Sequence, residues 1–448
     1  MSPLFKTCLA KISRLLGCCL LFCLSSSLVC GQVGFDHPPI DYLKSQPDDV
    51  IARLQRQIDQ GQVQLKHDEH GGYLRAVLAA LNVPVSSQGL VYSKTSFQLR
   101  KISPETPRAV FFGDDVYIGW VHDGEVMEIS AVDPKLGANF YTLSQEVKER
   151  PQFRRHTHEC LQCHASSLTK GVPGHIVRSV YPLADGQPML SAGTFLTDHS
   201  SPLKERWGGW YVTGKHGSQQ HMGNLLLAAN TDPTTLKLES TGNIVDLRTH
   251  FVTTGYASPH SDIVALLVLE HQTTMHNLLT QASFLTRVAL RDAEVLNKML
   301  DRPTDHQSDS TTRRIHNAAE PIVKYLLFSR EAALIEPIQG TAGFAEEFAT
   351  RGPRDLHGRS LRAFNLKTRL FQYPCSYLIY SAVFDRLPEQ VQARVYKRLW
   401  EVLTGKDQSP DFEHLTAENR QAIWEILRET KAGLPEYWKE GAVTNPKK

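Results

Sequence analysis

The chain has 448 residues, 49 of them Lys or Arg and 47 Asp or Glu, and 41% are hydrophobic. This length and composition predict a folded protein with a sizeable core, and they exclude a mainly disordered chain, a collagen-like fibre and a polytopic membrane protein. The net charge of +2 provides no electrostatic reason to expect nucleic acid as a partner, because phosphate binding needs a strongly cationic surface.

The first 31 residues have the pattern of a secretory signal peptide. A basic start, an apolar run and small residues before the cleavage site follow one another: Lys6, Lys11 and Arg14, then Leu15 to Leu24, then Val29 and Gly31. We expect cleavage before Gln32 and export to the periplasm or the extracellular space. Lipid anchoring through Cys30 is the less favoured alternative, because Val29 is large for a lipidation site.

Removal of 31 residues from 448 would leave a mature chain of 417 residues. Three of the 49 basic residues and no acid would leave, so 46 basic residues would face 47 acids and the net charge would become −1. The mature chain would keep only Cys160, Cys163 and Cys375 of the eight cysteines. We expect no disulfide framework, and we interpret Cys375, which has apolar neighbours, as a buried thiol. We also expect no transmembrane segment, because no mature apolar run is long enough.

Between the signal peptide and residue 150, helical patterning gives way to strand patterning. Apolar residues recur at helical spacing from Asp48 to about Leu81. From Leu90 onward, residues 110–112 and 116–121 are β-rich and flank the turn residues 113–115. This arrangement predicts a hairpin, with 126–132 as a further strand.

Cys160-Leu161-Gln162-Cys163-His164 matches the C-x-x-C-H motif of covalent c-type haem attachment. Two thiols at this spacing can reach the vinyl groups on one edge of a porphyrin, and the following imidazole can bind the iron. A redox-active dithiol and half of a zinc site are the alternatives. Zinc would usually need a second cysteine pair, which the mature chain lacks. The pattern therefore favours haem.

Short strands are expected at 176–182 and 189–196, separated by the turn residues 184–187. Trp207-Gly208-Gly209-Trp210 follows, which we interpret as a close approach with aromatic packing, and which would also suit an apolar wall beside a haem. Asp198-His199 and Glu205-Arg206 are expected to form ordinary surface hydrogen bonds.

From about Asp262 the sequence is mainly helical. A long helix is expected to end near Leu300, before Asp301-Arg302-Pro303. Further helices are expected at 313–328, 344–350, 378–384, 388–403 and 417–430. The long helix places His271 and Met275 on one otherwise apolar face, which we interpret first as a core stripe with one hydrogen-bonded histidine.

The sixth ligand of a haem iron would usually be Met or His. Met222, His271 and Met275 are the candidates that we single out. An open sixth position would instead indicate catalysis, with His199 or His221 as a nearby base. The sequence leaves both possibilities open.

The motif resembles that of monohaem c-type cytochromes. From about Leu90 to His276 the chain also resembles large exported bacterial proteins with a single cytochrome c motif, on the stretches Val91–Phe97, Arg206–Tyr211 and Leu269–Gln272. The resemblance implies haem binding and electron transfer, without a particular substrate. It assigns one haem c per chain, with thioether bonds to Cys160 and Cys163 and axial ligation of the iron by His164.

The sequence therefore predicts an α+β fold with more helix than strand. We divide it into a signal peptide (1–31), a helical then β-rich region (32–150), a haem-binding region (151–235) and a mainly helical region (236–448). The favoured function is that of an exported cytochrome passing electrons between redox partner proteins. The alternatives are a peroxidase-like or dehydrogenase-like haem oxidoreductase and a haem-based sensor. Because one haem needs fewer than 417 residues, we also expect elements for partner recognition or substrate binding.

Overall fold

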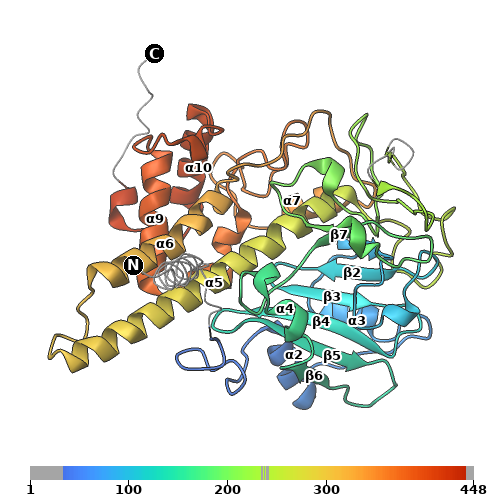
Figure 1. Cartoon of the computed structure of the whole chain (residues 1–448), viewed down its shortest axis with the longest axis horizontal. Coiled ribbons are helices and arrows are strands. Elements are labelled where there is room, and N and C mark those ends of the chain that lie inside the picture. The colour runs from blue at the N-terminus through green and yellow to red at the C-terminus, as the bar shows by residue number, and fades with distance from the viewer. Residues whose placement is uncertain (1–33, 234–235, 237, 239–241, 440–448) are drawn as a thin grey trace, which may run out of the picture. The chain divides into compact units, whose positions relative to one another are not determined.

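A computed structural model describes residues 34–233, 236, 238 and 242–439 of the chain (Figure 1). The expected signal peptide and Cys30 lie outside the described residues. The described part belongs to one contact-defined unit that begins at Gly34. This unit combines helices with an antiparallel sheet and has more helix than strand, which confirms the expected mixed α+β class.

Among the described residues, seven antiparallel strands form a sheet in the order β6-β5-β4-β3-β2-β1-β9. The strands are β1 (Gly89–Val91), β2 (Arg108–Phe112), β3 (Val116–Trp120), β4 (Val126–Asp133), β5 (Gly137–Ser144), β6 (Phe153–His156) and β9 (Trp210–Tyr211). The expected hairpin is β2 and β3, and β4 is the expected further strand. Because β6 and β9 come after residue 150, the region boundary expected there does not coincide with an edge of the sheet.

One face of the sheet packs against α2 (Val50–Asp59) and α3 (Leu74–Ala80), the two helices of the N-terminal helical pattern. Strand residues alternate between the faces, so Ile118 and Ile129 enter this core. Asp49 caps α2 by accepting from the backbone N–H of Ile51 at 3.0 Å and also accepts from the Tyr141 hydroxyl at 2.7 Å. One carboxylate therefore starts the helix and joins it to β5.

The opposite face of the sheet contacts α5 (Ile263–Met299), the expected long helix (Figure 1). Asp262 caps α5 by accepting from the backbone N–H of Val264 at 2.8 Å. Tyr117 and Val132 enter the core around α5, on the sheet face that α2 and α3 do not cover. The first half of α5 is buried on all sides and nonetheless carries a run of polar residues: Glu270, His271, Gln272, Thr273, His276 and Asn277.

The remaining long helices pack around α5 and one another. They are α6 (Asp309–Leu326), α7 (Phe344–Thr350), α9 (Glu389–Leu403) and α10 (Ala417–Thr430). These match the expected helices to within a few residues. The helix expected at 378–384 is instead a 3-10 turn (Tyr377–Tyr380) followed by α8 (Ala382–Asp385). Ser381 lies between them in an extended conformation and caps α8 through its hydroxyl, which interrupts the helix.

The expected strands after the motif are present as β7 (Arg178–Val180) and β8 (Thr194–Leu196), a separate antiparallel pair. The glycines of Trp207-Gly208-Gly209-Trp210 do permit a close approach: a side chain at Gly208 would clash with the Val180 carbonyl oxygen. Cys375 is fully buried, as expected. Among the described residues, no helix has both the length and the apolar character needed to cross a membrane.

Candidate haem-attachment site

The motif forms the short helix α4 (Leu161–His164), with Cys160 at its N-cap position. Cys160 and Cys163 are both free thiols; Cys160 is half-buried and Cys163 is exposed. Residues three positions apart are neighbours on a helix surface. The two thiols therefore lie on one helical turn near the protein surface, and Cys163 is the more accessible of the two.

One ring nitrogen of His164 is held by the chain and the other is not. Nδ1 lies 2.9 Å from the Gly174 carbonyl oxygen. Because a carbonyl only accepts, Nδ1 carries the proton, and in the neutral ring Nε2 then presents a lone pair. Among the described residues, Nε2 of this half-buried side chain has no hydrogen-bond partner. A histidine that binds a metal typically has this arrangement.

Hydrogen bonds join the loop that carries Gly174 to α4 on one side and to α5 on the other. The Gly174 backbone N–H donates to the His164 carbonyl at 2.8 Å, so two hydrogen bonds join these residues. Asn277 on α5 accepts from the His175 backbone N–H at 2.8 Å and donates to the His175 carbonyl at 2.7 Å. A side chain at Gly174 would clash with Asn277. Because position 174 is a glycine, Asn277 of α5 can approach closely and hold the loop whose carbonyl binds His164.

The sheet also contacts His164, through the aromatic ring of Phe140 on β5. In Figure 1, α4 lies over β4 and β5, and the Phe140 ring of β5 is 4.8 Å from the His164 ring. Burial lowers the pKa of His164, while the hydrogen bond to Gly174 opposes this shift. The imidazole is therefore neutral at neutral pH, as a metal ligand must be.

The environment of Cys160 differs from that of a reactive dithiol. Burial and then the charges of Glu128 and Glu159 raise the pKa of Cys160 to about 11. A nucleophilic thiol in a redox C-x-x-C motif usually has a pKa below the ordinary value, because a nearby cation or helix N-terminus stabilises its thiolate. The redox alternative gains no support from this site.

The zinc alternative requires further ligands around the two thiols. Within the described ranges, no three His, Cys, Asp or Glu side chains are arranged to hold a metal ion. The donor set of two surface thiols and one oriented imidazole instead suits a porphyrin, which itself supplies four ligands to its iron.

Two of the three sixth-ligand candidates bond to other side chains, and the third is buried in the core. Both His271 nitrogens are engaged, Nδ1 with His199 Nδ1 and Nε2 with the Ser376 hydroxyl, each at 2.8 Å. Met222 Sδ accepts from the Ser179 hydroxyl at 3.7 Å, within a small apolar cluster. Met275 is completely buried in the core around α5. Ligation by His271 would require loss of at least one of these buried hydrogen bonds, because the iron binds one ring nitrogen.

His199 and Arg206, expected at the surface, are buried, so that prediction is wrong. Tyr325 and Phe328 stack on the hydrogen-bonded pair of His199 and His271, with Tyr325 4.0 Å from the His199 ring and Phe328 4.4 Å from the His271 ring. Arg206 forms an ion pair with Glu270 at 2.9 Å, and both side chains are almost fully buried. His199 and Arg206 therefore bond to buried protein groups instead of to water at the surface, where the sequence led us to expect them.

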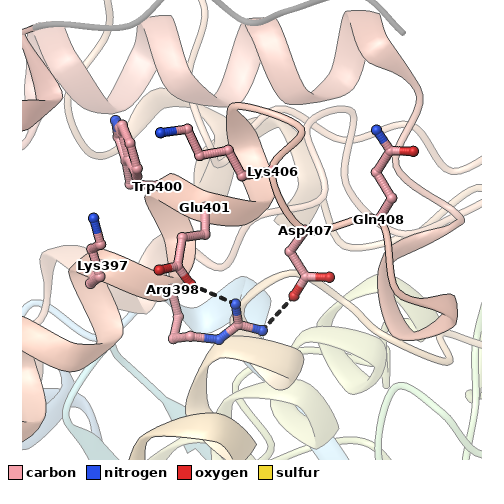
Figure 2. Close-up of a pocket in the computed structure, with 7 residues that line it drawn as sticks. All are labelled: Lys397, Arg398, Trp400, Glu401, Lys406, Asp407 and Gln408. Carbon is pink, nitrogen blue, oxygen red and sulfur yellow. Dashed lines mark hydrogen bonds and ion pairs between the residues drawn. The ribbon is translucent and has the colours of Figure 1, made fainter.

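Two surface clefts lie outside the motif. One, of about 560 Å³, is lined by Lys397, Arg398, Trp400, Glu401, Lys406, Asp407 and Gln408 (Figure 2). Arg398 donates to Glu401 and Asp407 there, at 2.8 and 2.5 Å, so its charge is already balanced. The other, of about 410 Å³, includes Phe328 and His414. No residue of the motif lines either cleft, so neither enlarges the candidate site.

Sequence reasoning missed the residues that support His164. Pro173-Gly174, ten residues after the histidine, was a signal for a turn close to the motif. Gly119, in the interior of a β-rich run, was a signal for a close approach of another group. Neither signal indicates by itself which group approaches.

Comparison of the chain with protein-family models, with curated proteins and with solved structures finds no match.

Proposed function

We propose that the protein is an exported monohaem c-type cytochrome that carries single electrons. Haem c would be attached through Cys160 and Cys163, with His164 as the axial ligand of the iron. The single observation that carries this proposal is the state of His164: its Nδ1 is bound to the Gly174 carbonyl while its Nε2 is unpaired, directly beside two surface thiols.

The chain's own residues would perform three tasks. Gly174 orients the imidazole and keeps the proton on Nδ1, Asn277 fixes the Gly174 loop on α5, and burial keeps His164 neutral. When bound, the haem would supply a centre that cycles between Fe(II) and Fe(III). Transfer of one electron then requires little movement of the protein, because the ligand is already oriented.

Most of the chain would serve purposes other than enclosing the haem. The two large apolar cores, on either side of the sheet, contain no residue of Cys160 to His164. The motif lies at the surface, next to the half-buried edge strand β6. We infer that the larger part of the protein presents this site to a redox partner protein outside the cytoplasm.

A haem-dependent oxidoreductase or sensor is the second candidate function. The observation that favours it is the engagement of His271 and Met222 with other partners, which would leave the sixth position of the iron open. An open position admits a small ligand or a substrate, whereas a closed one favours electron carriage.

Covalent attachment is tested by expressing the full chain with an intact export signal in a host that matures c-type cytochromes. We expect haem to remain on the protein in a denaturing gel, and to be lost from the Cys160→Ala, Cys163→Ala double variant. Cys375→Ala is the matched control and should retain haem, because that thiol is buried. Covalent haem in the double variant, or none in the unaltered protein, would refute the proposal.

The choice between carrier and oxidoreductase is tested by adding carbon monoxide to the reduced protein. For the carrier we expect an unchanged visible spectrum, and rapid CO binding would favour the second candidate. Met222→Leu and Met275→Leu approximately conserve side-chain volume. Loss of the low-spin spectrum in one of them would identify the sixth ligand.

A further inference from the structure

An ion pair spans three strands on the sheet face that adjoins the motif. Arg108 on β2 and Glu128 on β4 are joined by a contact of 2.8 Å between Nη2 and Oε2. Gly119 on β3 lies between them and pairs with Glu128 across the strands. A side chain at Gly119 would clash with the Arg108 guanidinium. Because Gly119 has no side chain, Arg108 has room to reach Glu128.

The pair is partly shielded from water and held in place. The side chains of Arg108 and Glu128 are 21% and 17% exposed. Gln98 donates to the second carboxylate oxygen of Glu128 at 3.1 Å, so both oxygens are occupied. Arg108 Nε is buried without a hydrogen-bond partner among the described residues. Charges in such a position are screened less than exposed ones.

The strand register brings this pair close to the candidate iron ligand. Glu128 lies opposite Thr142, and Phe140 is two residues from Thr142 on the same face of β5. The Phe140 ring in turn contacts the His164 ring. The ion pair therefore lies beside the part of β5 whose ring contacts the imidazole.

We propose that the Arg108–Glu128 pair sets the reduction potential of the haem iron bound by His164. This inference rests on the proposed function. The iron site loses one positive charge on reduction, so a nearby cation favours the reduced state and a nearby anion favours the oxidised state. Arg108 therefore raises the potential and Glu128 lowers it. Gly119 is a positioning residue, because it acts only through Arg108.

The test is a spectroelectrochemical titration of the full-length, covalently loaded protein. We expect a lower midpoint potential for Arg108→Gln, a higher one for Glu128→Gln, and an intermediate one for the double variant. Arg108→Lys retains the charge and should restore a potential close to that of the unaltered protein. A solely structural role would give no such rescue by charge and no opposite signs.

The Arg314–Asp292 ion pair is the control. It has the same length of 2.8 Å, but its side chains are more exposed, at 43% and 56%. Asp292 lies about 22 Å along α5 from Asn277, at 1.5 Å per residue. Arg314→Gln and Asp292→Asn should leave the potential unchanged.

Shifts of the same sign in Arg108→Gln and Glu128→Gln, or no shift in either, would overturn this inference. If Arg108→Gln does not fold, Glu128→Gln and Arg108→Lys still decide it. Absence of covalent haem from the unaltered protein would instead refute the proposed function, so the two failures are distinguishable.

Discussion

Two histidine environments in this protein differ in how their ring nitrogens are occupied. His164, beside the motif, is half-buried, with Nδ1 bound to a backbone carbonyl and Nε2 unpaired. His271, on α5, is fully buried, and both of its nitrogens have partners. The comparison shows that the number of nearby histidines is a poor guide to a metal site. Because His175 and His276 also have one ring nitrogen that is unpaired among the described residues, the informative feature is an unpaired nitrogen that lies next to two thiols in the chain.

The two environments also differ in how they are stabilised. Around α5, buried polar groups such as Arg206 and Glu270 are paired with one another, and removal of one partner leaves the other without compensation. Around α4, the support comes from backbone groups of a loop and from one ring on the sheet. We therefore expect substitutions near α5 to affect stability most, and substitutions near α4 to affect the cofactor most.

The largest expected effect on stability is at Arg206. Arg206→Ala would leave the Glu270 carboxylate buried without its ion-pair partner, and we expect the free energy of unfolding to fall by about 3–5 kcal/mol. Urea unfolding followed by circular dichroism measures this change. Arg314→Ala, at an exposed ion pair, should cost at most about 1 kcal/mol. Equal losses in the two variants would contradict the buried-pair interpretation.

Replacing His164 and His271 separately with alanine tests the difference between the two histidine environments. His271→Ala removes the partners of His199 and Ser376 and leaves a cavity, so we expect a loss of about 2–4 kcal/mol in unfolding free energy with an unchanged haem spectrum. His164→Ala should change the haem spectrum with a smaller loss of stability. An altered spectrum in His271→Ala would instead support His271 as the sixth ligand.

An effect that appears only on acidification is expected from the titration of His276, whose Nδ1 lies 2.8 Å from the Tyr117 hydroxyl. Burial lowers the pKa of His276 to about 3, against 6.5 in the unfolded chain. Between these values only the unfolded state binds the proton. The neutral His276 side chain therefore contributes to folding stability in full above pH 6.5, and this contribution is lost as the pH falls from 6.5 towards 3.

His276→Gln should remove this contribution. We expect the slope of unfolding free energy against pH, measured between about pH 6 and 4, to decrease by about 1.4 kcal/mol per pH unit. An unaltered slope would indicate that His276 takes up its proton in the folded state.

Much of the fold could be predicted because local patterns determine it. The helical spacing after Asp262 and the cap at that residue correspond to α5, and the ends of α7 and α10 match the expected ranges. β5 and β6 were not predicted as strands. The adjacent residues Phe140 and Tyr141 are buried on opposite faces of β5, so alternation between apolar and polar residues is weak there, and β6 has only four residues.

The candidate site could be predicted only in part. Cys160, Cys163 and His164 are adjacent in sequence, so their spacing alone indicates a chemistry. Gly174 reaches His164 through a turn, whereas strand register and the glycine at position 119 bring Arg108 and Glu128 beside β5, the strand that contacts His164. Such proximity depends on tertiary structure, which one sequence does not reveal. The sixth-ligand candidates remain predictions from the sequence.

The surface position of the motif has a consequence for the order of assembly. Both apolar cores are complete without Cys160 to His164, and Cys163 is exposed. The packing of the two cores would therefore not depend on a bound porphyrin. Under the proposed function, the chain would be able to fold before a porphyrin is attached, and a shortage of haem would lower the amount of active protein rather than the amount of folded protein.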